Sequence, residues 1–334
     1  LLSQQSDFTI FDEYYHALFE LIPSLPLNLL TYSIECLKLN SQMKIPASNA
    51  NQILEFLIRI LGQFLSQYQG DQSNSSIFWM RKLLHSLYIS IASVNQHCDD
   101  GIIQLGQTLY GLISATIQNY FLPSSLLCIA TLSYPIPKFV ESQLATFIPL
   151  VIQAIQTYDD PSILVPAVRI VPILIEKLDL GDFYPQLIIN VLEALRSGQS
   201  SESKIASLDT LSQIISISGN KTLQFINIIH NNIGFLISHL DVCYAKYQED
   251  TFPIISLIIK IEKSVFDILP VQQKRIIFDL CFSMILMISK MPNVLESALQ
   301  SIFDLILFLH QNFTTELFTS IQKYPEIGEL LRSS

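Results

Sequence analysis

The sequence has few of the residues that interrupt helices or build sheets. Only 10 of its 334 residues are glycine, and the strict apolar and polar alternation of half-buried strands is almost absent. Apolar positions recur at helical spacing instead, as in Thr210 to Ile217, where Leu211, Ile214 and Ile215 fall on one face. The pattern predicts an all-α chain.

Charged residues are also scarce. They make up 14% of the chain against 50% hydrophobic residues, so the chain must bury a large apolar surface and is not disordered. Long hydrophobic runs are missing too: no run approaches the roughly 18 residues of a membrane-spanning helix. The best candidate, residues 280–289, is bounded by Asp279 and Lys290. We therefore expect buried core helices and no membrane span.

Basic residues are the scarcer of the two charged classes. The chain has 19 Lys and Arg against 29 Asp and Glu, which gives a formal net charge of -10. A surface of this sign repels the phosphates of nucleic acids and attracts basic partners. Direct nucleic-acid binding is therefore not expected.

Motifs for catalysis and for metal or cofactor binding are missing as well. The five cysteines show no C-x-x-C spacing, which suits free thiols in a reducing compartment, and the six histidines include no H-E-x-x-H. A phosphate-loop spacing at Gly101 and Gly106 has Gln107 in place of lysine and no preceding strand, so we interpret these glycines as easing helix packing. The sequence predicts neither an enzyme nor a cofactor.

One short cluster could suggest a nucleophile or a metal site. His97-Cys98-Asp99-Asp100 places a thiol beside an imidazole and two carboxylates. Adjacent residues at a helix end point in different directions, whereas catalysis needs side chains that converge. We interpret the cluster as a helix C-terminus followed by an aspartate N-cap.

Proline and small polar clusters punctuate the chain at regular intervals. Candidate second helices begin near Pro123, Pro161, Ser201, Asp250 and Pro292, at intervals of 38 to 49 residues. Two-helix HEAT or armadillo repeats have a period of about 40 to 47 residues. In our parse the first and second helices of each repeat are 9–21 with 25–40, 49–69 with 76–95, 101–119 with 124–139, 141–157 with 161–178, 182–196 with 202–218, 221–240 with 247–268, and 271–290 with 293–311.

This parse predicts a single α-solenoid over residues 1–334. It has about seven repeats, and residues 314–331 begin a truncated unit. Neither helix of such a repeat can bury its apolar face alone, so neighbouring repeats stack and share a continuous core.

Acidic residues gather where second helices are expected to begin. They are Asp99, Asp100, Asp159, Asp160, Glu202, Glu249 and Asp250. Singly, each is interpreted as an N-cap or as a partner of the helix dipole. Together they would form an acidic ladder, because every repeat places its turn between first and second helix at the same edge. Trp79, the single tryptophan, is interpreted as core packing, with an exposed partner contact as the alternative.

The block from residue 126 to 225 carries a family resemblance. Its phrases Phe147-Ile-Pro-Leu-Val-Ile, Asp159-Asp-Pro-Ser, Ala167-Val-Arg-Ile-Val, Phe183-Tyr-Pro-Gln-Leu and Lys204-Ile-Ala-Ser-Leu resemble HEAT repeats. More narrowly, the block resembles the C-terminal half of importin beta (karyopherin beta) nuclear transport receptors. The resemblance implies protein transport through nuclear pores, with residence in cytoplasm, nucleus and nuclear envelope. It also implies that the chain, which begins at Leu1, is a C-terminal piece of a longer receptor.

The resemblance further implies partners. Receptors of this family bind basic cargo, or the importin-beta-binding helix of importin alpha, on their concave second-helix face. They bind phenylalanine-glycine nucleoporins between first helices on the convex face. RanGTP binding would require N-terminal repeats with no counterpart here. The residues expected to bind basic cargo are Asp159, Asp160, Glu202, Asp209, Glu249 and Asp250, with Trp79 as an additional candidate.

Other functions remain open. The chain could be a HEAT scaffold of another kind, such as a phosphatase regulatory subunit or a vesicle coat adaptor subunit, which would organise a multiprotein complex around a globular partner. An enzyme with a helical domain is a further alternative, although no motif supports it.

Overall fold

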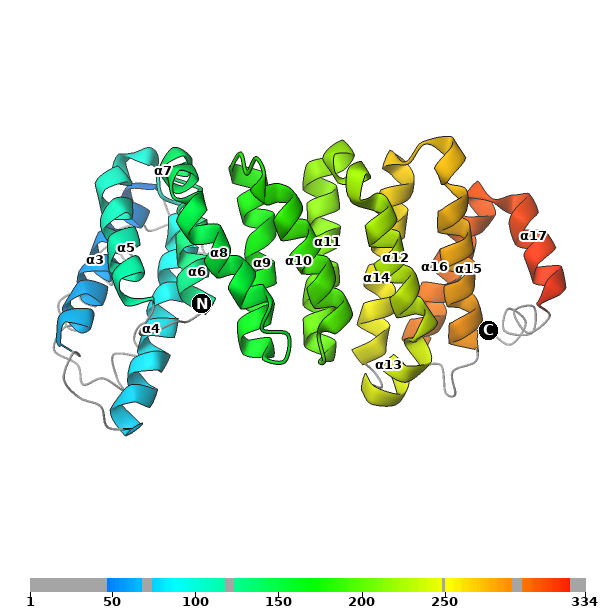
Figure 1. Cartoon of the computed structure of the whole chain (residues 1–334), viewed down its shortest axis with the longest axis horizontal. Coiled ribbons are helices and arrows are strands. Elements are labelled where there is room, and N and C mark those ends of the chain that lie inside the picture. Colours follow the sequence, from blue (N-terminus) through cyan, green and yellow to red (C-terminus); the bar gives the residue numbers. More distant parts are fainter. Residues whose placement is uncertain (1–46, 68–73, 118–122, 248–249, 290–295, 325–334) are drawn as a thin grey trace, which may run out of the picture. The chain divides into compact units, whose positions relative to one another are not determined.

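The computed structural model describes residues 47–67, 74–117, 123–247, 250–289 and 296–324. Within these ranges the chain consists of α-helices, short 3₁₀ helices and turns, and it contains no strand (Figure 1). The prediction of an all-α chain is confirmed. The first predicted helix pair, 9–21 with 25–40, lies outside the described residues.

The helices divide between two compact units. The first unit comprises residues up to 150 together with 177–179, and the second comprises 151–176 and 180–334. The first unit contains α3 (Ala47–Gln67), α4 (Asn74–Asn95), the 3₁₀ helix η3 (Asp100–Ile102), α5 (Ile103–Thr116), α6 (Pro123–Thr131) and α7 (Pro137–Ser142). Helix α8 (Leu144–Ile155) begins in the first unit and ends in the second. The single solenoid over 1–334 stays a prediction.

The second unit contains the remaining helices. They are α9 (Pro161–Lys177), α10 (Phe183–Ser197), α11 (Ser201–Ser218), η4 (Gly219–Phe225), α12 (Ile226–Ser238), α13 (Leu240–Tyr247), α14 (Thr251–Ile268), η6 (Val271–Gln273), α15 (Arg275–Ser289), α16 (Glu296–Asn312) and α17 (Thr314–Lys323).

Helices in the second unit stack in two layers. In one, which we call the A layer, α10 packs against α12 and α12 against α15. In the other, the B layer, α11 packs against α14 and α14 against α16. Helix α10 also packs against α11, and α15 against α16, so these two A helices are paired with B helices. The first unit repeats the scheme, with α3 against α5, α4 against α6 and α3 against α4.

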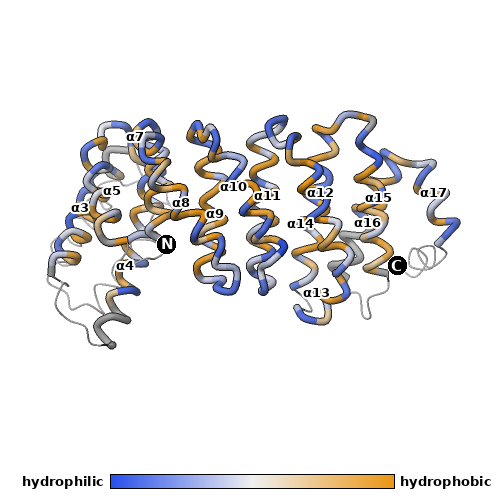
Figure 2. Tube along the Cα trace, in the orientation of Figure 1, coloured by the Kyte–Doolittle hydropathy of each residue, from blue (hydrophilic) through white to orange (hydrophobic). Residues whose placement is uncertain are grey.

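The core lies between the layers. Leu211, Ile214 and Ile215, which share one predicted face, are at most 2% exposed. Figure 2 shows apolar residues along the helices and hydrophilic residues concentrated at the turns. This is the expected arrangement when amphipathic helices bury one face against neighbouring repeats.

The structure differs from the predicted helices in two places. The helix expected at 124–139 ends at Thr131, and a separate short helix, α7, begins at Pro137. Pro135 and Pro137 explain the break, because a residue before proline is pushed out of the helical region. The second difference is α13, which stands between α12 and α14 instead of continuing either of them.

No helix in the described ranges is both long enough and apolar enough to cross a membrane. The apolar segment at residues 280–289 belongs to α15, where Cys281, Met284 and Ile285 are fully buried. The helix packs against α12, α14 and α16 and is therefore part of the protein core.

Candidate partner-binding site

The predicted binding residues concentrate in the second unit, at the starts of α9, α11 and α14. In Figure 1 the turn into α9, the turn into α11 and helix α13 lie along one edge of this unit. We call this the acidic edge and define it by Asp159, Asp160, Glu202 and Asp250. All four side chains are exposed.

At the start of α9, one of two neighbouring aspartates caps the helix. The Asp160 carboxylate accepts hydrogen bonds from the Ser162 backbone N–H, at 3.0 Å, and from the Ser162 hydroxyl. Pro161 occupies the first helical position, where a missing N–H costs nothing. The N-cap interpretation is therefore confirmed for Asp160, while Asp159 lies one residue outside the cap.

At the start of α11 the cap is a serine. The Ser200 hydroxyl accepts a hydrogen bond from the Ser203 N–H at 3.0 Å, and Glu202 lies in the first turn. A carboxylate in the first turn interacts favourably with the helix dipole. Two residues after Glu202 in α11, the Lys204 side chain is almost buried, and its ammonium donates to the Leu195 carbonyl at 3.1 Å. Desolvation lowers the pKa of Lys204.

A hydrogen bond connects the starts of α11 and α14. The Ser201 hydroxyl donates to Asp250 Oδ2 over 2.8 Å, although the two residues are 49 positions apart in the chain. Asp250 precedes α14, and its side chain makes no capping hydrogen bond there. The contact places acidic residues of neighbouring repeats next to each other. Glu249 lies outside the described residues.

Helix α13 brings a basic residue to the acidic edge. Lys246 Nζ and the Tyr247 hydroxyl both donate to the Gln199 carbonyl, each at 2.8 Å. Gln199 belongs to the turn that leads into α11, so positive charge lies beside Ser200 and Glu202. The edge is thus a mixed surface and not an uninterrupted row of carboxylates.

Two predicted residues lie away from this edge. Asp209 is half-buried on α11, where its carboxylate accepts a hydrogen bond from Gln213 Nε2 at 2.9 Å. Trp79 belongs to α4 in the first unit, and its side chain lies outside the described residues. The structure therefore brings four of the seven predicted residues to one edge and places Asp209 along a helix that begins there.

The aspartates at 99 and 100 do not extend the ladder. Asp99 precedes η3, Asp100 is the first residue of η3, and α5 follows. Because α5 packs against α3, the helix that these aspartates begin is a first helix and not a second one. The expected N-cap is confirmed, because Asp99 Oδ1 accepts from the Gly101 N–H at 3.0 Å and from Asn51 Nδ2 at 2.8 Å. Burial, followed by the Asp99 charge, raises the pKa of the Cys98 thiol to about 12. A thiol with this pKa stays protonated and is a poor nucleophile.

The phosphate-loop spacing has a packing explanation. A Cβ at Gly106 would collide with the end of the Ile136 side chain, so the glycine eases the close approach of α5 to the segment before α7. This confirms the packing interpretation. In the described part of the chain, no group of three or more His, Cys, Asp or Glu side chains is arranged to hold a metal ion.

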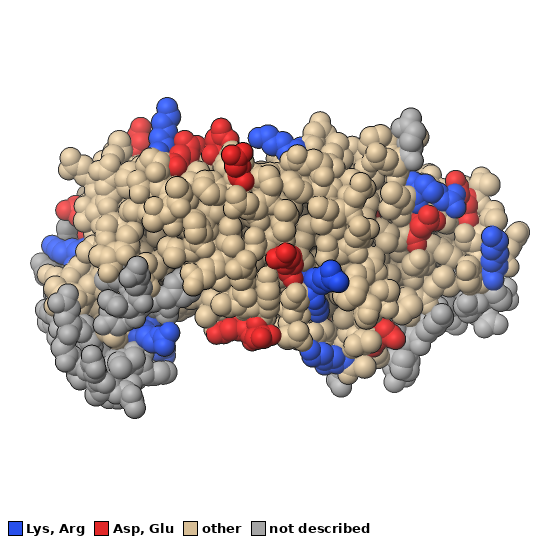
Figure 3. All heavy atoms as spheres, viewed as in Figure 1, with Lys and Arg blue, Asp and Glu red and all other residues tan. Residues whose placement is uncertain are grey.

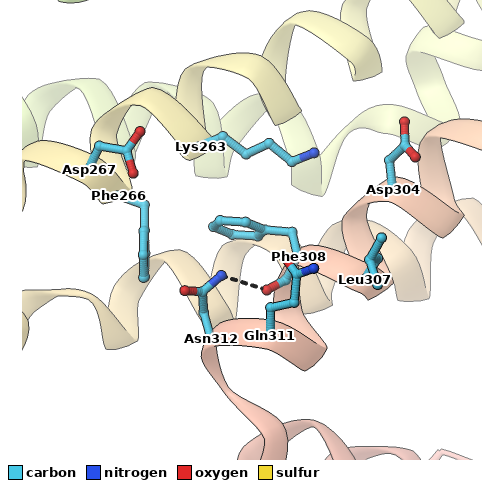
Figure 4. A pocket seen from close by; sticks show the side chains of 8 residues that line it. All are labelled: Lys263, Phe266, Asp267, Asp304, Leu307, Phe308, Gln311 and Asn312. Carbon is cyan, nitrogen blue, oxygen red and sulfur yellow. Dashed lines mark hydrogen bonds between the residues drawn. The ribbon is translucent and has the colours of Figure 1, made fainter.

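A groove of about 380 Å³ opens between α14 and α16 of the B layer. The Phe266 and Phe308 rings line it and meet edge to face at 5.2 Å between centroids. Asp267, Lys263 and Asp304 lie around it, with Leu307, Gln311 and Asn312 completing the lining (Figure 4). Asn312 Nδ2 donates to the Phe308 carbonyl at 2.8 Å.

Sequence reasoning missed this groove. Helical spacing was the only sequence pattern that pointed to the groove. Asp304 and Phe308 are four residues apart and fall on one helix face, and the same holds for Lys263 and Asp267. Nothing in the sequence indicated that these two faces lie opposite each other, because α14 and α16 are separated by a whole helix.

The A layer exposes isolated apolar side chains on successive helices. Ile189 on α10, Phe235 on α12 and Ile276 on α15 are 41%, 41% and 42% exposed. Charged side chains are sparse in the view of Figure 3, and most of those visible lie toward the edges. Arg196 covers part of Phe235, with its guanidinium 5.2 Å from the ring centroid.

A buried ionisable pair joins the two layers. His230 on α12 is 5% exposed and Glu262 on α14 is 1% exposed, with 3.3 Å between Nε2 and Oε2. The separation is that of an ion pair, yet the geometry gives none of their four polar atoms a hydrogen-bond partner within the described part of the chain. This contact lies on the side of α14 that faces the core.

Comparison with known proteins identifies the fold. No protein-family model and no curated protein sequence matches the chain. Among solved structures, importin beta crystallised in a polyethylene glycol condition matches 98% of the chain with a TM-score of 0.73 at 15% identity, over 41% of its own length. Yeast importin-beta (Kap95p) matches 98% with a TM-score of 0.72 at 14% identity, over 40% of its length. The Kap95:Nup1 complex matches 96% with a TM-score of 0.69 at 15% identity, over 39%.

These likenesses establish the fold and its extent. The chain spans about two fifths of the length of the importin beta chains that it resembles. With its paired helices stacked in two layers, the chain has the fold of an all-α HEAT-repeat solenoid like that of importin beta.

Proposed function

We propose that this chain is a binding module of a karyopherin-like nuclear transport receptor. Its B layer, with the acidic edge, binds basic cargo or the importin-beta-binding helix of an importin-alpha-type adaptor. Its A layer binds phenylalanine-glycine nucleoporins, and the protein works in the cytoplasm, the nucleus and at the nuclear envelope. The activity is binding, without a chemical step.

One contact carries the B-layer part of the proposal. The hydrogen bond between Ser201 and Asp250 places Glu202 and Asp250, from neighbouring repeats, on one edge. A row of carboxylates along stacked repeats complements a basic segment, and a net charge of -10 favours the approach of such a partner. The likeness in fold to importin beta supports the same function.

Exposed apolar residues on the A layer support the nucleoporin part. Phe235 and Ile276 stand on adjacent helices, α12 and α15, which pack against each other. Exposed apolar side chains on neighbouring helices suit contact with a partner's aromatic ring.

The test is a titration of a fluorescent peptide, equivalent to the basic importin-beta-binding helix, at two salt concentrations. We expect binding that weakens as salt rises, because exposed charges are screened. The double variant Asp159→Asn/Asp250→Asn should weaken binding roughly fivefold at low salt, whereas Asp182→Asn/Asp279→Asn, which removes two charges elsewhere, should not. Asparagine is used because it keeps hydrogen-bonding capacity at both positions.

A further control separates the two layers. Phe235→Ser should lower the affinity for a peptide with repeated phenylalanine-glycine pairs and leave the affinity for the basic peptide unchanged. If the wild-type protein does not bind the basic peptide even at low salt, the cargo proposal is wrong, and a scaffold that binds a folded subunit becomes the better explanation.

A further inference from the structure

The groove between α14 and α16 has the composition of a site for an organic cation. Two aromatic rings line it, and the carboxylates of Asp267 and Asp304 stand on opposite sides (Figure 4). Aromatic faces attract cations, and carboxylates pair with them by charge and hydrogen bonding. Both properties occur together in this one hollow of the B layer.

The chain already places its own cations against these rings. Lys274 Nζ lies 3.8 Å from the centroid of Phe266 and covers that ring. Lys263 Nζ lies 5.7 Å from the centroid of Phe308, near the outer limit for such a contact. Figure 4 shows the Lys263 side chain extending over Phe308 toward the side where Asp304 lies. The Phe308 ring is therefore occupied only loosely.

We infer that the groove is a subsite for one arginine side chain of a partner polypeptide, and that Lys263 occupies it when no partner is bound. In the bound state the guanidinium stacks on Phe308 and pairs with the Asp304 carboxylate. Lys263 swings out into solvent, which its four-carbon chain and half-exposed position allow. The inference rests on the proposed function, because it assigns one residue of the partner to this groove.

Arginine fits this site better than lysine for two reasons. A planar guanidinium can stack on an aromatic face while its edge donates two parallel hydrogen bonds to a carboxylate, whereas an ammonium is a strongly hydrated point charge. Leu307, which is 55% exposed, offers an apolar contact to the aliphatic part of the ligand or to its neighbouring residue.

Lys263 is then an internal competitor, and its removal should strengthen binding. It repels an incoming cation and holds the ring that the guanidinium needs. Removing one like charge at close range changes affinity by roughly three- to tenfold. Lys260 provides a matched control, because it is an exposed lysine on the same helix that does not line the groove.

The experiment uses the full chain labelled with 4-fluorophenylalanine and the small probe N-acetyl-L-arginine amide, followed by fluorine NMR. The resonance of residue 308 is assigned from its loss in Phe308→Leu. We expect the arginine probe to shift this resonance, the corresponding lysine probe to bind at least threefold more weakly, and the citrulline probe to cause no shift. Lys263→Met should lower the dissociation constant three- to tenfold, Lys260→Met should change it less than twofold, and Asp304→Asn should raise it.

The outcomes separate this inference from the proposed function. If the arginine probe leaves the residue 308 resonance unmoved in both wild type and Lys263→Met, the subsite does not exist, while the response of basic-peptide binding to the acidic-edge variants still decides the function. Equal binding of arginine and lysine probes, or equal effects of Lys263→Met and Lys260→Met, would overturn the arginine selectivity and the competitor role respectively. Thermal unfolding of each variant confirms that the fold is retained.

Discussion

The acidic edge and the groove use aspartate in different ways. At the edge, Asp160 caps α9 and Asp250 accepts a hydroxyl from α11, so both carboxylates already contribute to the fold. In the groove, Asp267 and Asp304 stand beside half-buried aromatic rings, away from any helix start. Helix capping accounts for the presence of an aspartate at the edge even if no other protein binds there. It does not account for the presence of an aspartate in the groove. The aspartates of the two regions therefore differ in what they do for the helices that carry them.

The largest effect on stability is expected from a carboxylate that belongs to neither region. Glu262→Ala leaves the buried imidazole of His230 without the carboxylate beside it, and leaving a buried polar group without its partner costs about 3 kcal/mol. The free energy of unfolding measured in urea should fall by this amount. The groove variant Asp267→Ala, five residues further along α14, should change it by less than about 0.5 kcal/mol. Equal losses would mean that Asp267 supports the fold, which would remove the contrast between groove and core.

An intermediate effect should distinguish the two aspartates that begin α9. Asp160→Ala removes the N-cap and should cost about 1 kcal/mol of unfolding free energy, while Asp159→Ala should cost only a few tenths. Both variants remove one charge from the edge, so both should weaken binding of the basic peptide by similar factors. If only Asp160→Ala weakened binding, the edge would act through helix stability and not through its charge.

The smallest effect concerns the contact between neighbouring repeats. A double-mutant cycle of Ser201→Ala and Asp250→Ala measures the coupling free energy of their hydrogen bond. Because both groups are exposed, we expect about 0.5 kcal/mol, at the low end for hydrogen bonds in proteins. A coupling near zero would show that the two carboxylate-bearing helix starts are positioned by packing alone, and it would weaken the case for a fixed acidic edge.

The fold could be predicted from the sequence because its signals are local and repeated. Helical spacing placed Leu211, Ile214 and Ile215 on a buried face, and the start of α9 was evident from Asp160-Pro161. The division of the helix predicted at 124–139 was missed even though Pro135 and Pro137 are visible in the sequence. The helical spacing of apolar residues continues through these prolines, so the spacing alone predicts one helix. The backbone restriction that the prolines impose divides it.

The candidate site was only partly predictable. Asp159, Asp160 and Asp250 could be predicted as binding residues, because their charge and their position within the repeat are both visible in the sequence. The placement of Lys246 beside Gln199 depends on the turn between α12 and α13, which no period encodes. The groove depends on which faces of α14 and α16 meet, and this is decided by side-chain packing over about 40 residues of chain.

Helix α13 has a mechanical consequence for the repeat that contains it. Two donors from its last turn, Lys246 and Tyr247, share the single Gln199 oxygen. Moving the turn before α11 away from α13 would break both hydrogen bonds in the same movement. Because α13 also packs against α14, these two bonds connect the start of α11 to the helix that leads into α14.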